Sequence, residues 1–592
     1  MASIDEILKM HEEGGSKNKE KLAEMLMKNV DDTLDKLPHQ GMAYGTLYET
    51  LNKQKAILQL HTSGSSDKSS AYLLESAGVS ARKLFCSRKS EANLPIIDSR
   101  TASVDGIPDK QVNQDENLIN FSMDPLEFRD RLKDLPSDCV IVQLSELYPG
   151  QRPFDPPYVQ TRPLHLARYC CGENYMDQCV QVIALPQPLP AAKNSDILQE
   201  LKAVVQDNVE LISAGNKLGY KHTRLLLEER FRVVLEAVQD WLGPWRCLLL
   251  GQISSSKVSS SWNKTIRKLA DELNIEEENI SKFSMLAQCS NVLKKVDLVH
   301  GLQAIVPKTV KNMVEFVSNA AKLIKKYSQE CFGLDLLKLN EVQRHPVILI
   351  VDNNIFAVPW EQLDIVQVHP MSRMPCLALV HAMFKAPKSK RELDPGSAFF
   401  VLDPDKNLPR ASQLKPLFVA RNEWKGIVGE APGSTEMKKH LQDDDIYIYC
   451  GHGSGSHLIH NYDHINLNAA AMLMGCSSAD LYRRGVHWEM SGAPLNFILS
   501  GSPICLGTLW TVTDSDTNRI TVRLLETWLP PKEKDSRYRM ELCSQDLSFA
   551  KVFEDVLPQK GLLGALRSAQ SVATSKIISS AFIAIGIPVY VK

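Results

Sequence analysis

The sequence predicts an α/β fold built on a mostly parallel sheet that helices cover on both faces. The first observation is that strand patterns and helical patterns alternate in the last third of the chain. The second is that the predicted strands at 469–474 and 504–512 are continuous apolar runs, which is typical of strands buried on both faces. The third is a globular composition: the 592 residues are 44% hydrophobic and 23% charged.

Charge and hydropathy exclude some classes of function. The formal net charge of −2 gives no long-range attraction toward nucleic acid. The longest apolar stretch, 577–591, contains Ser579 and Pro588 and is too short to span a bilayer. The residues after Met1 have a helical pattern rather than that of a signal peptide. The 13 scattered cysteines mostly sit in apolar runs, so we expect a reducing, intracellular compartment.

The N-terminal fifth of the chain divides into two predicted segments. Residues 1–60 are expected to be helical, because apolar residues recur there at helical spacing among charged ones. Residues 61–120 are rich in Ser, Asp, Lys, Asn and Gln and hold few large apolar side chains. Such a segment buries too little surface to order itself, so we expect a flexible linker or a mostly disordered insertion.

Strands flank a long helical block in the middle of the chain. Strands are predicted within 139–147, 159–186 and 345–361, and between the last two apolar residues recur at three and four. The polar, proline-containing stretch 386–397 predicts a domain junction. The predicted units are 121–395, with a helical insertion at about 195–340, and 396–592.

Three predicted strands near the C-terminus end in polar residues. His452 follows the first, Cys476 the second, and the third runs into Asp514 and Asp516. If the strands are parallel neighbours, these residues share one sheet edge, where sites form in such folds. An antiparallel hairpin would separate His452 from Cys476, but a connector of about 16 residues suits a short crossover better.

These residue types suit nucleophilic catalysis. A nearby histidine and a helix N-terminus both favour a cysteine thiolate, and the Ser477-Ser478 pair is a plausible helix start. His452 can accept the thiol proton and later donate it to a leaving amine. The glycines around His452 let a peptide lie close to the imidazole. The N–H groups of Gly453 and Cys476 could together stabilise an oxyanion.

Structural readings stay open for each of these features. A Gly-His-Gly run can be a simple turn, and Asp514 and Asp516 can cap the amphipathic helix that follows them. The chain lacks the Gly-Lys-Ser/Thr of a phosphate loop and the Gly-x-Ser-x-Gly of a serine hydrolase. A zinc site is a weak alternative because the spacing of its candidate ligands fits no common pattern: His165, Cys170, Cys171 and Cys179.

The strings "IYIYCGHGSGSHL", "AMLMGCSSADL" and "CLGTLWTVTDSDTNRIT" resemble the motifs of the separases, in the family's order and spacing. Separases are caspase-fold cysteine proteases that cleave the kleisin subunit of cohesin. "VILIVDNNIFAVPWE" and "FFVLDPDKNL" are also similar to the family. The resemblance runs from about residue 130 to the C-terminus.

The resemblance implies a role for each candidate residue. His452 matches the general base and acid, Cys476 the nucleophile, and Gly453 the oxyanion amide. Asp514 and Asp516 match the acidic segment of the pocket for the substrate arginine. Family members usually have Asp where Thr511 stands, which puts one local hydrogen bond in doubt. The family's fold pairs an inactive caspase-like domain, carrying a helical insertion, with an active caspase-like protease domain.

The resemblance also implies partners and a location. The expected substrate is a kleisin cut after arginine, usually in Glu-x-x-Arg, and the expected inhibitor is a securin-like protein. No cofactor, metal, membrane or sequence-specific nucleic acid is expected, and the location would be cytoplasm and nucleus, near mitotic chromosomes and spindle. The short region before residue 130 is similar to that of insect separases, whose missing helical repeats come from another polypeptide. A fragment would look the same.

Two further functions stay open on the sequence. One is another caspase-fold protease that cuts after a basic residue. The other is a caspase-fold scaffold, although such a protein need not keep both His452 and Cys476.

Overall fold

The computed structural model describes most of the chain. The described residues are 16–34, 45–62, 66–79, 81–82, 84–85, 125–146, 164–173, 180–185, 197–215, 219–307, 310–332, 342–386, 390–459, 466–483, 490–531 and 537–592. Within these ranges, no helix is both long enough and apolar enough to cross a membrane.

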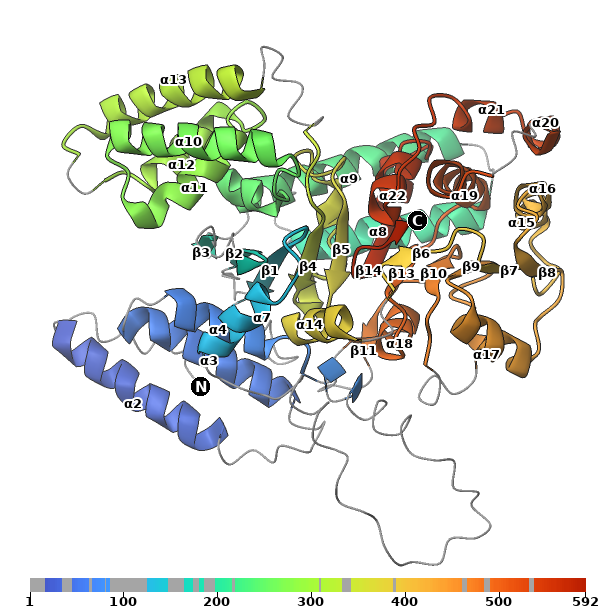
Figure 1. Ribbon diagram of the computed structural model, residues 1–592, viewed down its shortest axis with the longest axis horizontal. Helices are drawn as coiled ribbons and strands as arrows, with labels where there is room; N and C mark the ends of the chain where they lie inside the picture. The colour runs from blue at the N-terminus through green and yellow to red at the C-terminus, as the bar shows by residue number, and fades with distance from the viewer. Residues whose placement is uncertain are drawn as a thin grey trace, which may run out of the picture.

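One twisted sheet of 11 strands runs through the whole molecule (Figure 1). Its strand order is β3-β2-β1-β4-β5-β14-β13-β10-β9-β7-β8. The strands are β1 (Val140–Glu146), β2 (Leu164–Cys170), β3 (Val180–Leu185), β4 (Val347–Val351), β5 (Met371–Met374), β7 (Ala398–Leu402), β8 (Lys425–Val428), β9 (Ile446–Cys450), β10 (Ala470–Leu473), β13 (Ile504–Thr508) and β14 (Phe582–Gly586). Two small two-stranded sheets are formed by β6 (Glu392–Leu393) with β15 (Tyr590–Val591) and by β11 (Tyr482–Arg483) with β12 (Met490–Ser491).

Most neighbouring strands are parallel, which confirms the predicted sheet. The antiparallel exceptions are β3 with β2, β2 with β1, and β13 with β14. Central strands such as β4 and β9 are buried along their whole length, as their continuous apolar runs predict. On one face lie α19 (Asp514–Trp528) and α22 (Leu562–Gln570), and on the other α14 (Leu377–Lys385), α17 (Ser434–Asp443) and α18 (Ala493–Leu499) (Figure 1).

The junction predicted near residue 395 lies between α14 and β7, but the two halves share the same sheet. β5 of the first half pairs with β14 of the second, with Arg373 opposite Ile585. The Ser372 hydroxyl donates to the Gly586 carbonyl at 2.8 Å. The halves are therefore joined through backbone pairing at the middle of the sheet.

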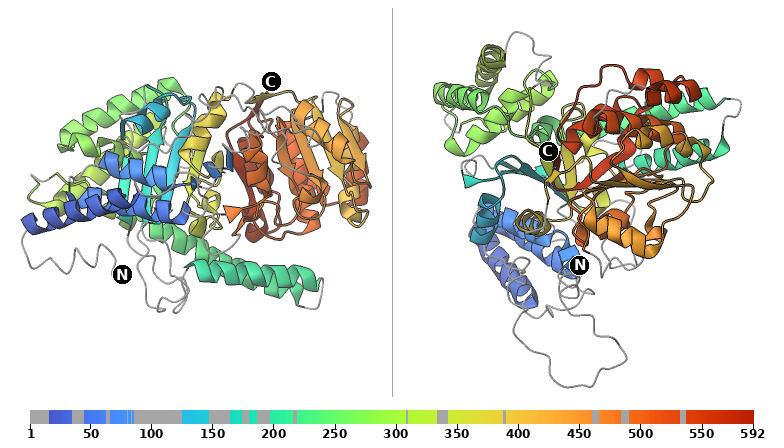
Figure 2. Two further views of the ribbon diagram at one scale, coloured as in Figure 1. Left: turned by 90° about the horizontal axis from the view of Figure 1, so that it is seen from below. Right: turned by 45° about the vertical axis from the view of Figure 1, so that its right-hand side comes forward.

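The helical block forms an insertion between β3 and β4. It consists of α8 (Ile197–Ala214), α9 (Tyr220–Leu242), η3 (Gly243–Leu249), α10 (Ser256–Leu273), α11 (Glu277–Gln288), α12 (Lys295–Gln303) and α13 (Met313–Phe332). Helices α10 to α13 form a bundle beside the first half, whereas the α8–α9 pair extends toward the second half (Figure 2). The break between η3 and α10 is fixed by an antiparallel bridge from Ile253 to Arg344.

The N-terminal helices cover the ends of β1 and β4. They are α2 (Ser16–Leu34), α3 (Gly45–Thr62) and α4 (Ser66–Ser76). The Lys53 ammonium of α3 lies 2.6 Å from Asp352, directly after β4, and both side chains are buried. Gln143 of β1 donates to the Leu73 carbonyl of α4 at 2.9 Å.

The linker prediction for 61–120 was wrong for its first part. Residues 66–76 form α4, which is polar at its start but buries Leu73 and Leu74. The polar composition concealed this short apolar face, which is stabilised by packing against α3 rather than by its own hydrophobicity. Residues 86–120 lie outside the described part of the chain.

The buried Lys53–Asp352 pair gives a prediction for stability. Lys53→Met should destabilise the protein by about 3–5 kcal/mol, because it leaves the Asp352 carboxylate buried without its cation. Thermal unfolding and limited proteolysis of α3 would measure this. The double variant Lys53→Met with Asp352→Leu should recover most of the loss. Lys68→Met, on an exposed position of α4, is the matched control, and an equal effect there would contradict the role of the pair.

Candidate active site

Three neighbouring parallel strands end at the same edge of the sheet, as predicted. β9 pairs with β10, with Tyr449 opposite Leu473, and β10 pairs with β13. His452 follows directly after β9, and Cys476 follows directly after β10. The parallel arrangement therefore places these two residues on adjacent loops at one edge.

The two loops touch through their backbones at Gly475. A Cβ atom at Gly475 would overlap the Gly453 carbonyl oxygen and lie 2.5 Å from that of Gly451. Real Cβ atoms do not approach other atoms so closely, so a side chain at this position would force the loops apart. Glycine directly before Cys476 thus allows the contact that holds the cysteine beside the histidine loop.

Glycine is required around His452 for two different physical reasons. A Cβ atom at Gly451 or Gly455 would collide with the Tyr449 ring, whose hydroxyl donates to the His452 carbonyl at 2.7 Å. Gly453 instead adopts φ +61°, a conformation that favours glycine, and no atom lies within 4 Å of its absent Cβ. Only Gly453 leaves open space, so the predicted explanation of a close substrate fits that glycine and not the other two.

The Cys476 thiol is half-buried and forms its hydrogen bond within the second half of the molecule. Its sulfur donates to the Val512 carbonyl at 3.2 Å. Burial raises the pKa of the Cys476 thiol above its ordinary value, and the nearby Asp514 carboxylate raises it further. His452 is exposed, and no hydrogen bond between the described residues joins its ring to the thiol. The cysteine is therefore a neutral thiol that must lose its proton during a reaction.

The helix predicted directly after Cys476 is absent from the structure. Residues 476–479 form a turn, which leads into the short strand β11. The serine that resembled a helix cap has another role: Ser478 donates to the Leu473 carbonyl at 2.6 Å and accepts from the Thr508 N–H at 3.0 Å. It thereby ties the cysteine turn to β13. The prediction that a helix N-terminus favours the Cys476 thiolate is consequently wrong.

Asp516 is occupied by its own neighbours. It is buried and accepts hydrogen bonds from Thr513, Arg519 and Thr574, between 2.5 and 3.0 Å. Thr513 caps α19 by accepting from the Asp516 N–H, and its hydroxyl donates to the Asp516 carboxylate. Burial alone would raise the pKa of Asp516, but these donors lower it overall. The N-cap of α19 is thus Thr513 and not one of the two aspartates, while the Asp516 carboxylate is engaged by Thr513, Arg519 and Thr574 and is not free for a substrate.

Asp514 is the carboxylate that remains available at this edge. It is the first residue of α19 and is exposed to solvent. Strand β13 ends at Thr508, four residues earlier than the apolar run suggested, so a loop at 509–513 brings Asp514 toward Cys476. From this position the Asp514 carboxylate raises the pKa of the Cys476 thiol.

Sequence reasoning missed the support that the helical insertion gives to the 509–513 loop. Asn208 of α8 is fully buried and donates to the Thr511 carbonyl at 3.0 Å. Arg224 of α9 donates to the Asn208 oxygen at 2.6 Å, and Phe231 packs edge-on against Trp510. The available signal was an asparagine placed on the apolar stripe of α8, in step with Leu201 and Val204.

The zinc alternative gains no support from the described residues. His165 is buried within β2, where burial lowers the pKa of its imidazole to about 3. Cys170 and Cys171 lie beside it in the chain, and Cys179 falls outside the described residues. Among the described residues, no group of three or more His, Cys, Asp or Glu side chains is arranged to hold a metal ion.

Comparison with known proteins points to one family. The family profile described as "Separin, protease domain" matches residues 190–517, more than half of the chain and both loops of the site. Separin of Mus musculus is 29% identical over 355 residues, which are 58% of this chain and 16% of the mouse protein. Separin of Schizosaccharomyces pombe is 30% identical over 196 residues, or 32% of this chain and 11% of that protein.

Solved structures show the same fold. The separase in a crystal structure of the Saccharomyces cerevisiae separase–securin complex matches with a TM-score of 0.66 and 14% sequence identity. The match covers 97% of this chain and 38% of the yeast chain. The chain therefore corresponds to well under two thirds of the length of these relatives.

The Asp514–Cys476 proximity predicts a change in thiol reactivity. Asp514→Asn removes a negative charge, which should lower the pKa of the Cys476 thiol and raise its thiolate fraction at pH 7.5. Alkylation of Cys476 by iodoacetamide, followed by peptide mass spectrometry, should become roughly two- to fivefold faster. Asp443→Asn makes the same charge change on an exposed residue at the other sheet edge and should have no effect. An unchanged rate in Asp514→Asn would show that the two groups do not interact.

The Asn208 contact predicts a loss of order in the loop. Asn208→Ala removes the donor to the Thr511 carbonyl and one of the acceptors of Arg224, at a cost of about 1–3 kcal/mol. Amide hydrogen exchange of a peptide that covers 509–513 should speed up, while α10 stays unchanged. Gln206→Ala on the exposed face of α8 is the control. Equal exchange in both variants would exclude Asn208 as a support of the loop.

Proposed function

Since the chain belongs to the separin family, we propose that it is a cysteine endopeptidase of sister-chromatid separation, with Cys476 as nucleophile and His452 as general base and acid. The observation that carries this proposal is the backbone contact of Gly475 with the loop of His452, which holds the two residues on adjacent strand ends. A cysteine and a histidine at one sheet edge combine a nucleophile with a proton acceptor.

The proposed reaction begins with a neutral thiol. As the Cys476 sulfur attacks the substrate carbonyl, its proton passes to the His452 imidazole. The N–H groups of Gly453 and Cys476 stabilise the resulting oxyanion, and Gly453 has the open side that this requires. The imidazolium then protonates the leaving amine as the carbon–nitrogen bond breaks. Water, deprotonated by His452, hydrolyses the thioester and restores the thiol.

We propose that the substrate is the kleisin subunit of cohesin, cut after arginine in sites of the Glu-x-x-Arg type. The exposed Asp514 carboxylate supports this choice, because a guanidinium needs an acceptor near the nucleophile and Asp516 is already occupied. Cleavage at this bond would release sister chromatids at anaphase. The chain would act in the cytoplasm and nucleus, near mitotic chromosomes and the spindle.

The proposed partners follow from the family. A securin-like protein would inhibit the enzyme, in keeping with the similar fold of the yeast separase solved in complex with securin. A separate helical-repeat polypeptide is a second proposed partner. Co-purification of the chain with a securin-like protein would test the first of these partners.

The assignment of the nucleophile is tested by three serine variants. Cys476→Ser should keep the melting temperature and lose cleavage of a kleisin peptide by at least about 1000-fold, because a serine hydroxyl is a far weaker nucleophile here. Cys450→Ser and Cys505→Ser lie inside strands and should retain activity per folded molecule. Full activity in Cys476→Ser would disprove the assignment.

Two Asn variants distinguish the proposed role of Asp514 in substrate binding from the structural role of Asp516. Asp514→Asn should slow cleavage of Glu-x-x-Arg peptides by about 100-fold or more, with little change in melting temperature. Asp516→Asn should lower the melting temperature instead, because it weakens the contacts with Arg519 and Thr574. Steady-state cleavage and thermal unfolding of each variant measure the two effects. Wild-type cleavage by Asp514→Asn would place the arginine site elsewhere.

A further inference from the structure

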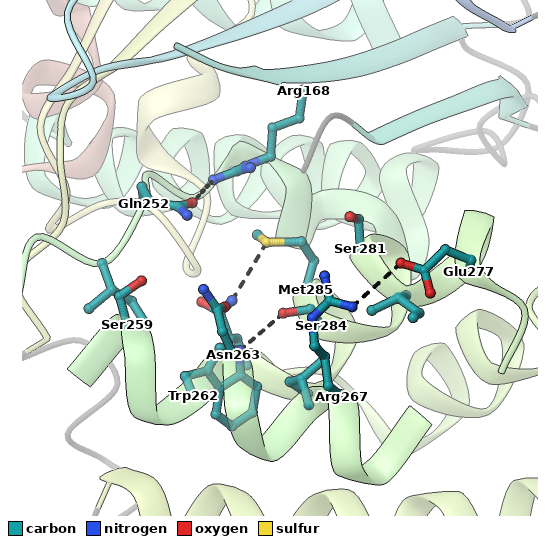
Figure 3. A pocket seen from close by; sticks show the side chains of 14 residues that line it. Arg168, Gln252, Ser259, Trp262, Asn263, Arg267, Glu277, Ser281, Ser284 and Met285 are labelled. Atoms are coloured by element: carbon teal, nitrogen blue, oxygen red, sulfur yellow. Dashed lines mark hydrogen bonds and ion pairs between the residues drawn. The ribbon is translucent and has the colours of Figure 1, made fainter. Parts of the chain in front are cut away.

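A polar cavity of about 260 Å³ lies in the first half of the molecule, within the helical insertion. Its walls come from α10, α11, the segment after η3, and β2 (Figure 3). Arg168 enters from β2, and Asn263 faces it from α10 (Figure 3). The rim carries one exposed pair, Arg267 with Glu277 at 3.6 Å. None of these residues belongs to the proposed protease site.

Arg168 is almost fully buried yet keeps spare donors. It is 1% exposed and donates to the Leu250 carbonyl at 3.1 Å, to the Cys170 sulfur at 3.0 Å and to the Gln252 oxygen at 2.9 Å. A guanidinium has five N–H groups, so two remain beyond these three contacts, on a residue that lines the cavity. All three of its acceptors are neutral groups.

A second buried guanidinium, that of Arg344, contacts a residue that lines the cavity. Arg344 donates through one nitrogen to the Gly251 carbonyl and to the Gln288 oxygen, and Gln288 lines the cavity. Its other two nitrogens have no hydrogen-bond partner. The pKa of Arg344 is lowered to about 10, chiefly by burial and in part by the charge of Arg168, while Cys289 acts in the opposite direction. The two cations are thus close enough to repel each other.

No carboxylate among the described residues forms a hydrogen bond with either guanidinium. Several other buried arginines have a carboxylate partner, as in the pairs Arg82–Glu75, Arg246–Asp297, Arg373–Glu361 and Arg421–Glu526. Arg567 has none among the described residues and donates instead to the Glu361 backbone carbonyl. A buried charge without a counter-charge is unfavourable, and here two of the same sign lie together. Glu277 is the carboxylate among the described lining residues, and it lies 3.6 Å from Arg267 at the rim, so it contacts neither buried guanidinium.

We propose that this cavity binds a phosphoryl group, either as free phosphate or on a phosphorylated polypeptide side chain. A phosphoryl group carries about −1.5 to −2 charges at neutral pH, which matches two guanidiniums better than a single carboxylate does. The spare N–H groups of Arg168 and the Asn263 amide supply donors for its oxygens. The site is independent of the protease proposal, because it shares no residue with the strand ends that carry His452 and Cys476.

Thermal unfolding of the full chain tests the site with inorganic phosphate. Phosphate should raise the melting temperature in a saturable way by about 1–3 °C, compared with sodium chloride at equal ionic strength. Asn263→Asp places a carboxylate in the cavity, so it should raise the melting temperature without phosphate and abolish the phosphate response. Ser261→Asp adds the same charge to an exposed position of α10 outside the cavity and should keep the response.

Two outcomes would overturn the proposal. The first is no saturable response of the wild-type chain to phosphate. The second is a full response in Asn263→Asp, which would mean that phosphate acts elsewhere.

A short peptide distinguishes the two sources of the phosphoryl group. Binding of Leu-phosphoserine-Leu to the full chain is measured by calorimetry, with inorganic phosphate and the unphosphorylated peptide alongside. Affinity at least tenfold above that of phosphate assigns the cavity to a phosphorylated polypeptide, and equal affinity assigns it to free phosphate. Equal binding of the unphosphorylated peptide would overturn the recognition of a phosphoryl group.

Discussion

The close approach of Gly475 to the carbonyls of Gly451 and Gly453 is the contact on which the site depends. It joins the loops that follow β9 and β10 through backbone atoms alone. The relative position of His452 and Cys476 is therefore fixed without a hydrogen bond between them, which leaves the imidazole exposed and the thiol bonded to Val512. Tyr449 supports the same arrangement, because its ring fills the space beside Gly451 and Gly455 and its hydroxyl donates to the His452 carbonyl.

The first half of the molecule supports the second although it carries none of the proposed catalytic residues. The loop at 509–513 receives Asn208 from α8 at the Thr511 carbonyl, and Phe231 from α9 packs on Trp510. Trp510 in turn donates to the Ile577 carbonyl at 3.1 Å, next to the strand that joins the halves. Because this loop accepts the hydrogen bond of the Cys476 thiol and leads to Asp514, the helical insertion sets the surroundings of the proposed nucleophile.

The carboxylates at the strand ends have different roles according to their burial. Asp516 and Asp352 are buried and are paired with cations and N–H groups, so they hold elements together. Asp514 is exposed and lacks such partners, so its charge acts on Cys476 and raises the pKa of the thiol. In the proposed function, a substrate guanidinium bound at Asp514 would neutralise that charge and thereby favour the thiolate when a substrate is present.

The sequence by itself determined the parallel sheet, the helical insertion and the two residues at adjacent strand ends, because continuous apolar runs and helical periodicity are local properties of the chain. It did not determine the end of β13, the turn after Cys476 or the helix α4. These depend on contacts between distant segments, such as the bonds of Ser478 to Leu473 and Thr508 and the packing of α4 on α3. The tertiary structure alone decided between Asp514 and Asp516, because sequence shows two similar carboxylates, whereas burial and hydrogen-bond partners show which one is already occupied.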